Sequence, residues 1–343
     1  MDKMQDAILV VGPSWIGDMV MAQTLFRFLQ DRQPDVVIDV LAPAAALPVV
    51  GRMPEIRQAI PLDLGHGQLQ LAKRRALGQG LRKNQYQHAI VLPNSWKSAL
   101  VPFHADIPVR TGFRGEYRYF LLNDMRLLNK RTMPRMVDRF VALGAPDGSG
   151  PVDFRLPELS INTDNQQVLR RTFDLEETRP VLGICPGAEF GRAKKWPERH
   201  FAKLANQAIA LGMQVWMFGG PGDRATGREI RAEVREKQFC LDFTGQTSLP
   251  DAIDLLAMCR VVVSNDSGLM HVAAAVGCTT AVLYGSTSAL FTPPLTEKLE
   301  VFSLELACSP CFKRDCPLGH QDCLNKLLPE QLIPVLEKHG VGT

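Results

Sequence analysis

The chain has 343 residues, a formal net charge of only +3, and a composition that is 45% hydrophobic and 22% charged, as in soluble globular proteins. This length is too great for one ordinary hydrophobic core and predicts two domains of about 150 residues each. No apolar run approaches the roughly 18 residues that a membrane span requires, and the N-terminal residues contain no secretory leader. We therefore expect a cytoplasmic protein.

Short apolar, β-branched runs alternate with segments of helical periodicity in the first half of the chain. Residues 18–32 are predicted to be helical because their apolar side chains recur at intervals of three and four. Strands are predicted at residues 7–11, 36–42 and 88–93.

The second half repeats this alternation. Helices are predicted over residues 198–212 and 267–277, and Gly277 suits the end of the second. Strands are predicted at residues 181–187, 214–220, 261–266 and 279–286. Alternating strands and helices are typical of parallel sheets covered by helices on both faces.

Residues 144–167 separate the two halves and are rich in Pro, Gly, Asp and Ser without periodicity, which indicates a linker. We therefore predict an α/β protein of two Rossmann-like domains, residues 1–160 and 161–343, that face each other across a cleft. Ligands of open α/β sheets bind beyond the carboxyl ends of the strands. Functional residues are expected in the turns that follow the predicted strands.

The first of these turns, in the stretch "VGPSWIGD", differs from known phosphate-binding turns. Its spacing, Gly-x-x-x-x-Gly-Asp, is neither the dinucleotide-binding Gly-x-Gly-x-x-Gly nor a P-loop ending in Lys-Ser/Thr. The turn ends at Asp18, a carboxylate where a phosphate site would favour a positive or neutral group.

Two turns in the second half have the features of an anion site. Residues 185–197 contain Gly187 and deliver Lys194 and Lys195 to the start of a helix, which suits a diphosphate clamp, although an exposed basic loop has the same pattern. Residues 264–275 end a strand and begin a helix whose free N–H groups favour phosphate. The polar residues of this second turn are Asp266, Ser267, Gly268 and His271.

Two candidates in the second half, His271 and Asp223, are interpreted individually. His271 lies one turn along its helix, where it faces the ligand or is simply a core residue. Asp223 follows the glycine-rich stretch "FGGPGD" and is placed where ribose hydroxyls could be held. Any single glycine turn is weak evidence, but three after strands predict nucleotide binding by the second half.

Basic residues are concentrated in the first half. Residues 66–118 contain nine Lys or Arg against two acids, and residues 124–139 contain five against two. This distribution indicates either a solvated positive face or a surface for an anionic partner.

Four of the eight cysteines cluster near the C-terminus in "CSPCFKRDCPLGHQDC", at Cys308, Cys311, Cys316 and Cys323. The Cys-x2-Cys pair is typical of half a zinc knuckle, but the second pair is separated by six residues. A structural zinc site, reduced cysteines in a loop and disulfides all stay open. The other cysteines, in or beside apolar segments, are expected in the core.

Several ungapped stretches together resemble the bacterial ADP-heptose:lipopolysaccharide heptosyltransferase II enzymes of glycosyltransferase family 9. They are "GPSWIGDMVMAQTLFRFL", "VLPNSWKSALVPFHADIPVRTGFRGEYRY", "PGAEFGRAKKWP" and "VSNDSGLMHVAAA". The resemblance extends over nearly the whole chain. It implies a GT-B fold, a donor ADP-L-glycero-D-manno-heptose bound by the second domain, and an acceptor heptosyl-Kdo2-lipid A bound by the first.

The resemblance also implies roles for single residues. Asp18 matches the family's general base, and Lys194 matches a lysine that contacts the donor phosphates. Asp223 falls where the family has an acid near the ribose. The motif that holds the diphosphate and sugar corresponds to Asp266, Ser267, Gly268 and His271, and we add Gly187 and Lys195 to the donor site.

These residues suit an inverting transfer in which Asp18 removes the acceptor proton, provided that its surroundings raise its pKa. Lys194 and a helix N-terminus supply positive charge, and no Asp-x-Asp pair follows a strand, so catalysis is expected to need no metal. Anionic groups of the acceptor, at the inner leaflet of the cytoplasmic membrane, are expected to bind the basic stretch through Arg110, Arg114 and Arg118.

Other functions fit less well. A nicotinamide dehydrogenase requires the missing Gly-x-Gly-x-x-Gly, and a nucleic-acid-binding protein requires stacking elements, whereas only 7% of the residues are aromatic. A transferase of the first or third heptose and a GT-B-like sugar-nucleotide epimerase remain alternatives. We expect no nucleic-acid partner.

Overall fold

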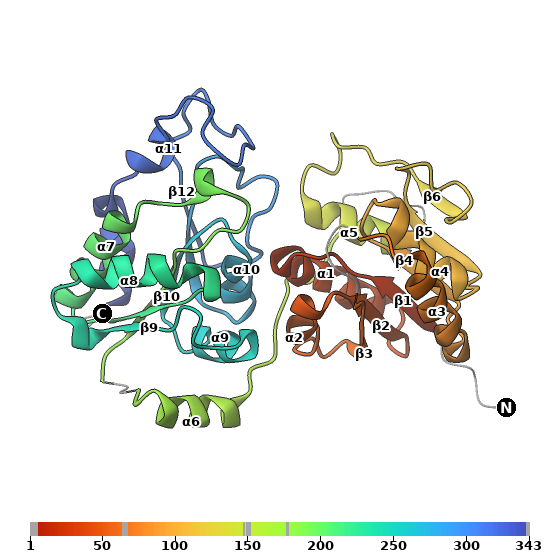
Figure 1. Cartoon of the computed structure of the whole chain (residues 1–343), viewed down its shortest axis with the longest axis horizontal. Helices are drawn as coiled ribbons and strands as arrows, with labels where there is room; N and C mark the ends of the chain where they lie inside the picture. The colour runs from red at the N-terminus through yellow and green to blue at the C-terminus, as the bar shows by residue number, and fades with distance from the viewer. Residues whose placement is uncertain (1–5, 64–67, 147, 149–151, 176–177, 341–343) are drawn as a thin grey trace. The chain divides into compact units, whose positions relative to one another are not determined.

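The computed structural model describes residues 6–63, 68–146, 148, 152–175 and 178–340. The chain divides into two compact units, Met1–Leu159 and Ser160–Thr343. The domain boundary predicted from the sequence lies between residues 160 and 161. In Figure 1 the first unit is coloured red to yellow and the second green to blue.

The first unit is built on one six-stranded sheet in the order β3-β2-β1-β4-β5-β6, and every pair of neighbours is parallel. The direction of winding reverses between β1 and β4, which are neighbours in the centre of the sheet. The strands are β1 (Ala7–Val11), β2 (Val37–Ala42), β3 (Ile56–Pro61), β4 (His88–Val91), β5 (Val109–Phe113) and β6 (Asp124–Arg126).

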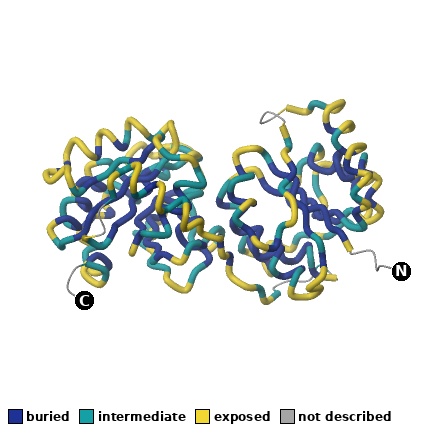
Figure 2. The backbone as a smooth tube through the Cα atoms, turned by 90° about the horizontal axis from the view of Figure 1, so that it is seen from below, coloured by how far each residue is buried: buried dark blue, intermediate teal, exposed yellow. Residues whose placement is uncertain are grey.

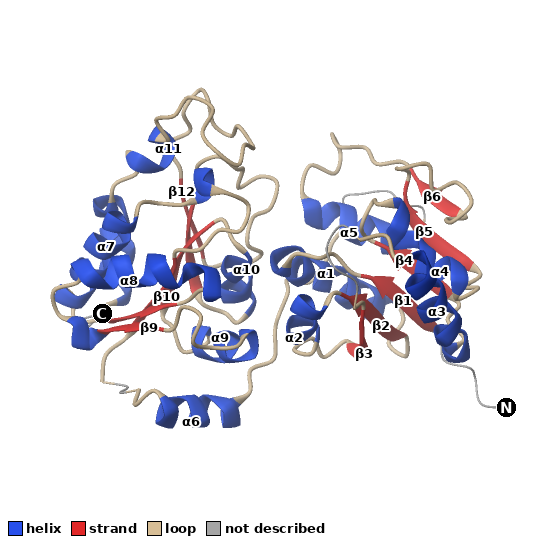
Figure 3. Cartoon of the chain, in the orientation of Figure 1, coloured by secondary structure: helices blue, strands red, loops and turns tan. Residues whose placement is uncertain are grey.

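Helices lie on both faces of this sheet, as Figure 3 shows. The first two and the last pack together on one face, and the third and fourth pack together on the other. The helices are α1 (Ile16–Arg32), α2 (Leu47–Val50), α3 (Leu71–Leu81), α4 (Leu100–His104) and α5 (Met136–Gly144).

The second unit has the same architecture, with a parallel sheet in the order β12-β11-β10-β7-β8-β9. Here the winding reverses between β7 and β10, so each sheet has a switch point of the kind at which α/β proteins bind ligands. The strands are β7 (Val181–Cys185), β8 (Gln214–Met217), β9 (Cys240–Asp242), β10 (Val261–Asn265), β11 (Thr279–Leu283) and β12 (Leu299–Phe302).

Helices again cover the second sheet, and Gly277, at φ 88°, follows the end of α10 as its residue type predicts. The helices are α6 (Thr163–Thr172), α7 (Glu198–Ala210), α8 (Arg224–Glu233), α9 (Leu249–Leu256), α10 (Gly268–Ala275), α11 (Asp322–Asn325) and α12 (Ile333–His339).

The central strands of each unit form its buried core (Figure 2). All residues of β1, β7 and β10 are buried, as expected for parallel strands covered on both faces. The four cysteines predicted in the core, Cys185, Cys240, Cys259 and Cys278, are all buried. Among the described residues, no helix has the length and apolar character needed to span a membrane.

Candidate active site

Asp18 lies at the switch point of the first sheet. It belongs to the first turn of α1, which follows β1, and its side chain is half-buried. The preceding Trp15 is 53% exposed and is the N-cap of α1 without a side-chain capping bond. The turn therefore presents a carboxylate at the carboxyl edge of the central strands, where the sequence analysis placed it.

The three arginines predicted to bind the acceptor have different surroundings. Arg114 follows the last residue of β5 and is exposed. Arg110 lies early in β5 and donates from Nε to the carbonyl oxygen of Leu121 (2.7 Å) and from Nη1 to that of Ile107 (2.6 Å).

Arg118 is only 1% exposed and holds the loop after β5 together. Its guanidinium donates to the carbonyl oxygens of Pro93 (2.8 Å) and Phe113 (2.6 Å) and to Oδ1 of Asn94 (3.1 Å). Its side chain is thus buried and stabilises this loop, and Arg114 is the most accessible of the three.

In the second unit, Lys194 and Asp266 form a buried ion pair at the carboxyl edge of the sheet. The ammonium Nζ of Lys194 lies 2.6 Å from Oδ2 of Asp266, and the two side chains are 15% and 6% exposed. Lys194 ends the 3₁₀ turn Arg192–Lys194 after β7, and Asp266 follows β10. The Lys194 Nζ also lies 5.1 Å from the ring centroid of Phe190.

Asn265 joins these two strand ends and is a site residue that the sequence analysis missed. Its Oδ1 accepts from the backbone N–H of Trp196 (3.0 Å), and its Nδ2 donates to the carbonyl oxygen of Pro186 (2.7 Å). Both side-chain groups of this fully buried residue are therefore used to fix the loop that carries Lys194. The sequence contained one signal for this role, a polar residue at the end of the apolar run "VVVSN".

The N-terminus of α10 adjoins this ion pair. Ser267 is its N-cap but makes no side-chain capping bond, and its Oγ lies 3.3 Å from Oγ of Ser264. The N–H groups of the first turn, which starts at Gly268, are thus without a side-chain cap. Uncapped N–H groups and the helix dipole together favour an anion.

His271 is buried in α10, only 5% exposed, and its Nδ1 has no hydrogen-bond partner among the described residues. Burial lowers its pKa to about 4; the Asp266 carboxylate opposes this shift and the Lys194 ammonium adds to it. His271 is therefore neutral at pH 7, beside the ion pair of the candidate site.

Asp223 belongs to the turn that follows β8, and its carboxylate lies against the turn that follows β7. Its Oδ2 accepts from the backbone N–H of Gly220 (3.0 Å), and its Oδ1 lies 3.9 Å from Nζ of Lys195. A Cβ atom on Gly187 would lie 2.5 Å from Oδ2 of Asp223, so a larger residue at this position would displace the Asp223 carboxylate. Asp223, Lys195 and Gly187 are thus brought together as one group.

The four C-terminal cysteines line one small cavity of about 20 Å³, together with His320 and Gln321. The backbone N–H of Gln321 donates to Sγ of Cys316 (3.4 Å), and this and neighbouring N–H groups lower the pKa of that thiol. All eight cysteines are free thiols. Within the described part of the chain, which includes this segment, no three acidic, histidine or cysteine side chains converge as a set that could hold a metal ion.

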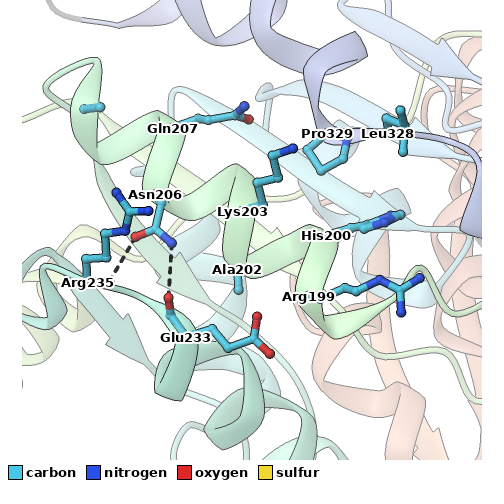
Figure 4. A pocket seen from close by; sticks show the side chains of 11 residues that line it. Arg199, His200, Ala202, Lys203, Asn206, Gln207, Glu233, Arg235, Leu328 and Pro329 are labelled. Carbon is cyan, nitrogen blue, oxygen red and sulfur yellow. Dashed lines mark hydrogen bonds between the residues drawn. The ribbon is translucent and has the colours of Figure 1, made fainter.

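A larger hollow of about 660 Å³ lies along α7 (Figure 4). Its lining mixes charges of both signs, including Arg199, Lys203, Glu233 and Arg235, and contains none of the predicted site residues. Asn206 accepts from the backbone N–H of Arg235 (2.9 Å) and donates to the carbonyl oxygen of Glu233 (3.2 Å). These bonds join α7 to the end of α8, and we assign the hollow no part in catalysis.

The predicted site residues thus form two sets, one in each unit. Asp18 and the three arginines belong to the first unit, whereas the lysines, Asp223 and the α10 residues belong to the second. Each set lies largely where strands end, as ligand-binding residues of α/β sheets do.

Comparison with known proteins gives a consistent result. The model of glycosyltransferase family 9 (heptosyltransferase) matches residues 74–321. Lipopolysaccharide heptosyltransferase 2 of Escherichia coli K12 is 46% identical over 337 residues, covering 96% of this chain and 97% of that protein. Lipooligosaccharide heptosyltransferase 2 of Haemophilus influenzae is 44% identical, with 96% and 98% covered.

The fold agrees with solved structures as well. The structure of E. coli ADP-heptose LPS heptosyltransferase II superposes with a TM-score of 0.87 at 43% identity and covers 98% of this chain and 99% of that chain. The fold is therefore GT-B, and the protein is a glycosyltransferase rather than an epimerase. By its family match and by these full-length relatives, the chain belongs to glycosyltransferase family 9, the heptosyltransferases.

Proposed function

We propose that this protein transfers L-glycero-D-manno-heptose from ADP-heptose to heptosyl-Kdo2-lipid A in the synthesis of the lipopolysaccharide inner core. The observation that carries the proposal is the Lys194 ammonium beside the uncapped N-terminus of α10, at the edge of the second sheet. A diphosphate leaving group needs this kind of positive field. The 46% identity to a heptosyltransferase 2 over nearly the full length supports the choice of donor and acceptor.

Asp18 is the general base of the proposed reaction. It takes the proton from the acceptor hydroxyl while that oxygen attacks the anomeric carbon of the donor, and the bond from that carbon to the ADP oxygen breaks. A single displacement of this kind inverts the configuration at the anomeric carbon. The position of Asp18 in the first turn of α1, half-buried at the edge of its sheet, supports the assignment.

The second unit stabilises the departing ADP. Lys194 and the N–H groups that begin at Gly268 take up the negative charge of the diphosphate. Because Asp266 holds the Lys194 ammonium at 2.6 Å, its part is to orient that lysine, and His271 offers a neutral ring beside them. Ser267, Gly187, Lys195 and Asp223 complete the donor site, with Asp223 at the ribose.

One assay tests this proposal directly. Purified protein is incubated with ADP-heptose and heptosyl-Kdo2-lipid A, with Kdo2-lipid A and an acceptor-free mixture as controls. We expect turnover only with the heptosylated acceptor, and Asp18→Asn should lower kcat by about 10²- to 10⁴-fold while ADP still binds. Turnover of Kdo2-lipid A would indicate addition of the first heptose instead. Full turnover by Asp18→Asn would eliminate Asp18 as the base.

Catalysis requires no metal ion in this proposal, because Lys194 and the helix N-terminus supply the positive charge. Rates with and without EDTA should therefore be equal. Activity that disappears with EDTA and returns with Mg²⁺ would overturn this part of the proposal.

The acceptor binds through the basic surface of the first unit, chiefly through Arg114. This residue is exposed at the carboxyl edge of β5, whereas Arg110 contributes only partly and Arg118 shapes the loop. Arg114→Glu should raise the acceptor KM and leave the donor KM unchanged. An unchanged acceptor KM would contradict this assignment.

The same loop makes transient contact with the cytoplasmic face of the inner membrane, where the acceptor is held. Tyr117, Tyr119 and Phe120 are 86%, 50% and 89% exposed beside Arg114, a combination of aromatic and basic groups that suits an anionic bilayer surface. Phe120→Ser should reduce co-sedimentation with vesicles containing phosphatidylglycerol. Leu290→Ser, at a residue 80% exposed in the second unit, is the matched control. Equal losses in both variants would contradict the assignment.

The four C-terminal cysteines hold a structural zinc ion, with no part in catalysis. Their gathering around one cavity and the N–H···S bond to Cys316 support this. Among the described residues the thiols do not converge as a metal-binding set, so zinc binding requires this segment to rearrange. Metal analysis of protein purified without added zinc should find about one zinc per chain, and Cys311→Ser should remove it while Cys240→Ser should not. Zinc-free protein with unchanged stability would refute the assignment.

A further inference from the structure

The segment that contains the C-terminal cysteines lies directly against the loop that carries Lys194. The backbone N–H of Ala193 donates to the carbonyl oxygen of Arg314 at 2.9 Å. A Cβ atom on Gly191 would lie only 2.4 Å from that same oxygen, so the approach of the two backbones requires glycine at this position. The contact joins residues that are far apart in the sequence.

Gln321 strengthens this contact through its side chain. Its Nε2 group donates to the carbonyl oxygens of Arg192 (3.0 Å) and Lys195 (2.9 Å). These two carbonyls lie on either side of Lys194 in the chain, so one amide group fixes both ends of the turn from which the lysine side chain projects. The amide's two N–H groups match the two acceptors.

The backbone conformation at Gln321 favours glycine. The presence of glutamine at this position is therefore explained by the hydrogen bonds of its side chain. Gln321 has φ 50° and ψ 34°, the left-handed conformation that favours glycine, and it is the N-cap of α11 without a side-chain capping bond. The strained conformation is held in place because Gln321 N–H donates to Cys316 Sγ, and its carbonyl oxygen accepts from Leu324 and Asn325 (3.1 and 3.0 Å). Glycine would satisfy all of these main-chain requirements.

We propose that Gln321 is a positioning residue for the transfer reaction, which acts by holding the Lys194 turn in the geometry that receives the donor diphosphate. This inference rests on the proposed role of Lys194. It assigns the cysteine-rich segment a functional connection to the donor site that does not depend on whether a metal is bound there.

The substitution Gln321→Gly separates this role from a structural one. It removes both side-chain bonds and relieves the left-handed backbone, so the variant should stay folded with a thermal midpoint close to that of the unmodified protein. We expect ADP affinity, measured by calorimetry, to fall on the order of tenfold, with a matching loss of kcat/KM for the donor and an unchanged acceptor KM. Gln331→Ala is the control, because the hydrogen bond that its side chain accepts comes from Leu328 N–H in its own turn (3.0 Å).

A double-mutant cycle with Lys194→Ala completes the test. Because Gln321 acts through Lys194, the double variant should bind ADP no more weakly than Lys194→Ala alone. Additive losses of affinity in the double variant would overturn this inference but not the proposed function. The same holds if Lys194→Ala is impaired while Gln321→Gly binds ADP as tightly as the unmodified protein. Absence of ADP binding by the unmodified protein would overturn the proposed function, and this inference with it.

Discussion

Arg114 and Arg118 belong to the same basic stretch, yet the structure uses them differently. Arg114 is exposed beyond β5, whereas Arg118 is buried and donates to carbonyl oxygens from two separate segments of the first unit. Burial lowers the pKa of the Arg118 guanidinium, and Glu116 opposes this shift. A charge count along the sequence could not distinguish the two, because it carries no information on which side chains the fold buries.

Because of this difference, the same substitution should affect stability at Arg118 and acceptor binding at Arg114. Arg118→Met should lower the free energy of unfolding by about 2–4 kcal/mol, because it removes the hydrogen bonds that the buried guanidinium donates to Pro93, Asn94 and Phe113. Arg114→Met should change it by less than about 0.5 kcal/mol while raising the acceptor KM. Urea unfolding and acceptor kinetics on both variants measure the contrast. A stable Arg118→Met protein would show that its hydrogen bonds contribute little.

His271 gives a prediction for the pH dependence of stability. Its pKa is about 4 in the folded protein and about 6.5 in an unfolded chain, so the unfolded state binds more protons between these values. Stability should therefore rise as the pH increases from about 4 to 6.5 and then level off. His271 alone contributes up to about 3 kcal/mol across this window.

The measurement compares urea unfolding at pH 7 and pH 4.5 for the unmodified protein and for His271→Gln. Burial also lowers the pKa of His88 and His200, so both proteins lose stability in acid, and the difference between them isolates His271. His320→Gln, at a side chain 39% exposed, is the control. Identical pH dependence in His271→Gln and the unmodified protein would contradict the assignment.

At the scale of elements, the linker is anchored to both units. Before the boundary, Gln23 of α1 donates to the carbonyl oxygen of Glu158 (2.7 Å) and accepts from its N–H (3.0 Å). After it, the buried Asp254 of α9 accepts from the N–H of Asn162 and from Nδ2 of Asn165, both at 2.8 Å.

Removing one anchor should loosen the linker on one side. Asp254→Ala takes away a buried acceptor of two hydrogen bonds and should cost about 2–4 kcal/mol of stability in the second unit. Limited proteolysis should then cleave within residues 152–165 faster than in the unmodified protein. Gln166→Ala, which loses one bond to the Asp254 carbonyl oxygen, should show a much smaller change. Equal cleavage rates would argue against this anchor.

The sequence predicted the central elements of the fold better than its edges. The predicted strands match β1, β2, β4, β7, β8, β10 and β11, whereas β3, β5, β6, β9 and β12 were missed. Four of the missed strands, β3, β6, β9 and β12, form the sheet edges. Edge strands are covered less completely and need no continuous apolar run, so short segments such as Asp124–Arg126 carry little signal.

A similar limit applies to the candidate site. Asp266 could be predicted because it directly follows the apolar strand β10, and Lys194 because it lies in the glycine-bearing turn after β7. Gln321 could not, because its bonds to Arg192 and Lys195 span 129 and 126 residues of sequence, and no local pattern marks such contacts. Side chains that support a site from a distant segment thus emerge only from the three-dimensional structure.

At the scale of the whole molecule, each unit has its own sheet and its own hydrophobic core. Every residue assigned to the donor site, from Gly187 to Gln321, belongs to the second unit. A unit with a complete core is expected to fold alone. Whether the second unit binds the donor without the first can therefore be tested by separating the two units.

We expect the isolated fragment of residues 160–343 to fold and to bind ADP with a Kd within about threefold of that of the full chain, since no donor contact is assigned to the first unit. Circular dichroism checks folding and calorimetry measures the Kd. Lys194→Ala in the fragment should weaken binding as it does in the full chain, and residues 1–159 should not bind ADP. A folded fragment without ADP affinity would mean that the first unit supplies essential donor contacts. The fragment should have no transferase activity in either case, because the proposed base, Asp18, lies in the first unit.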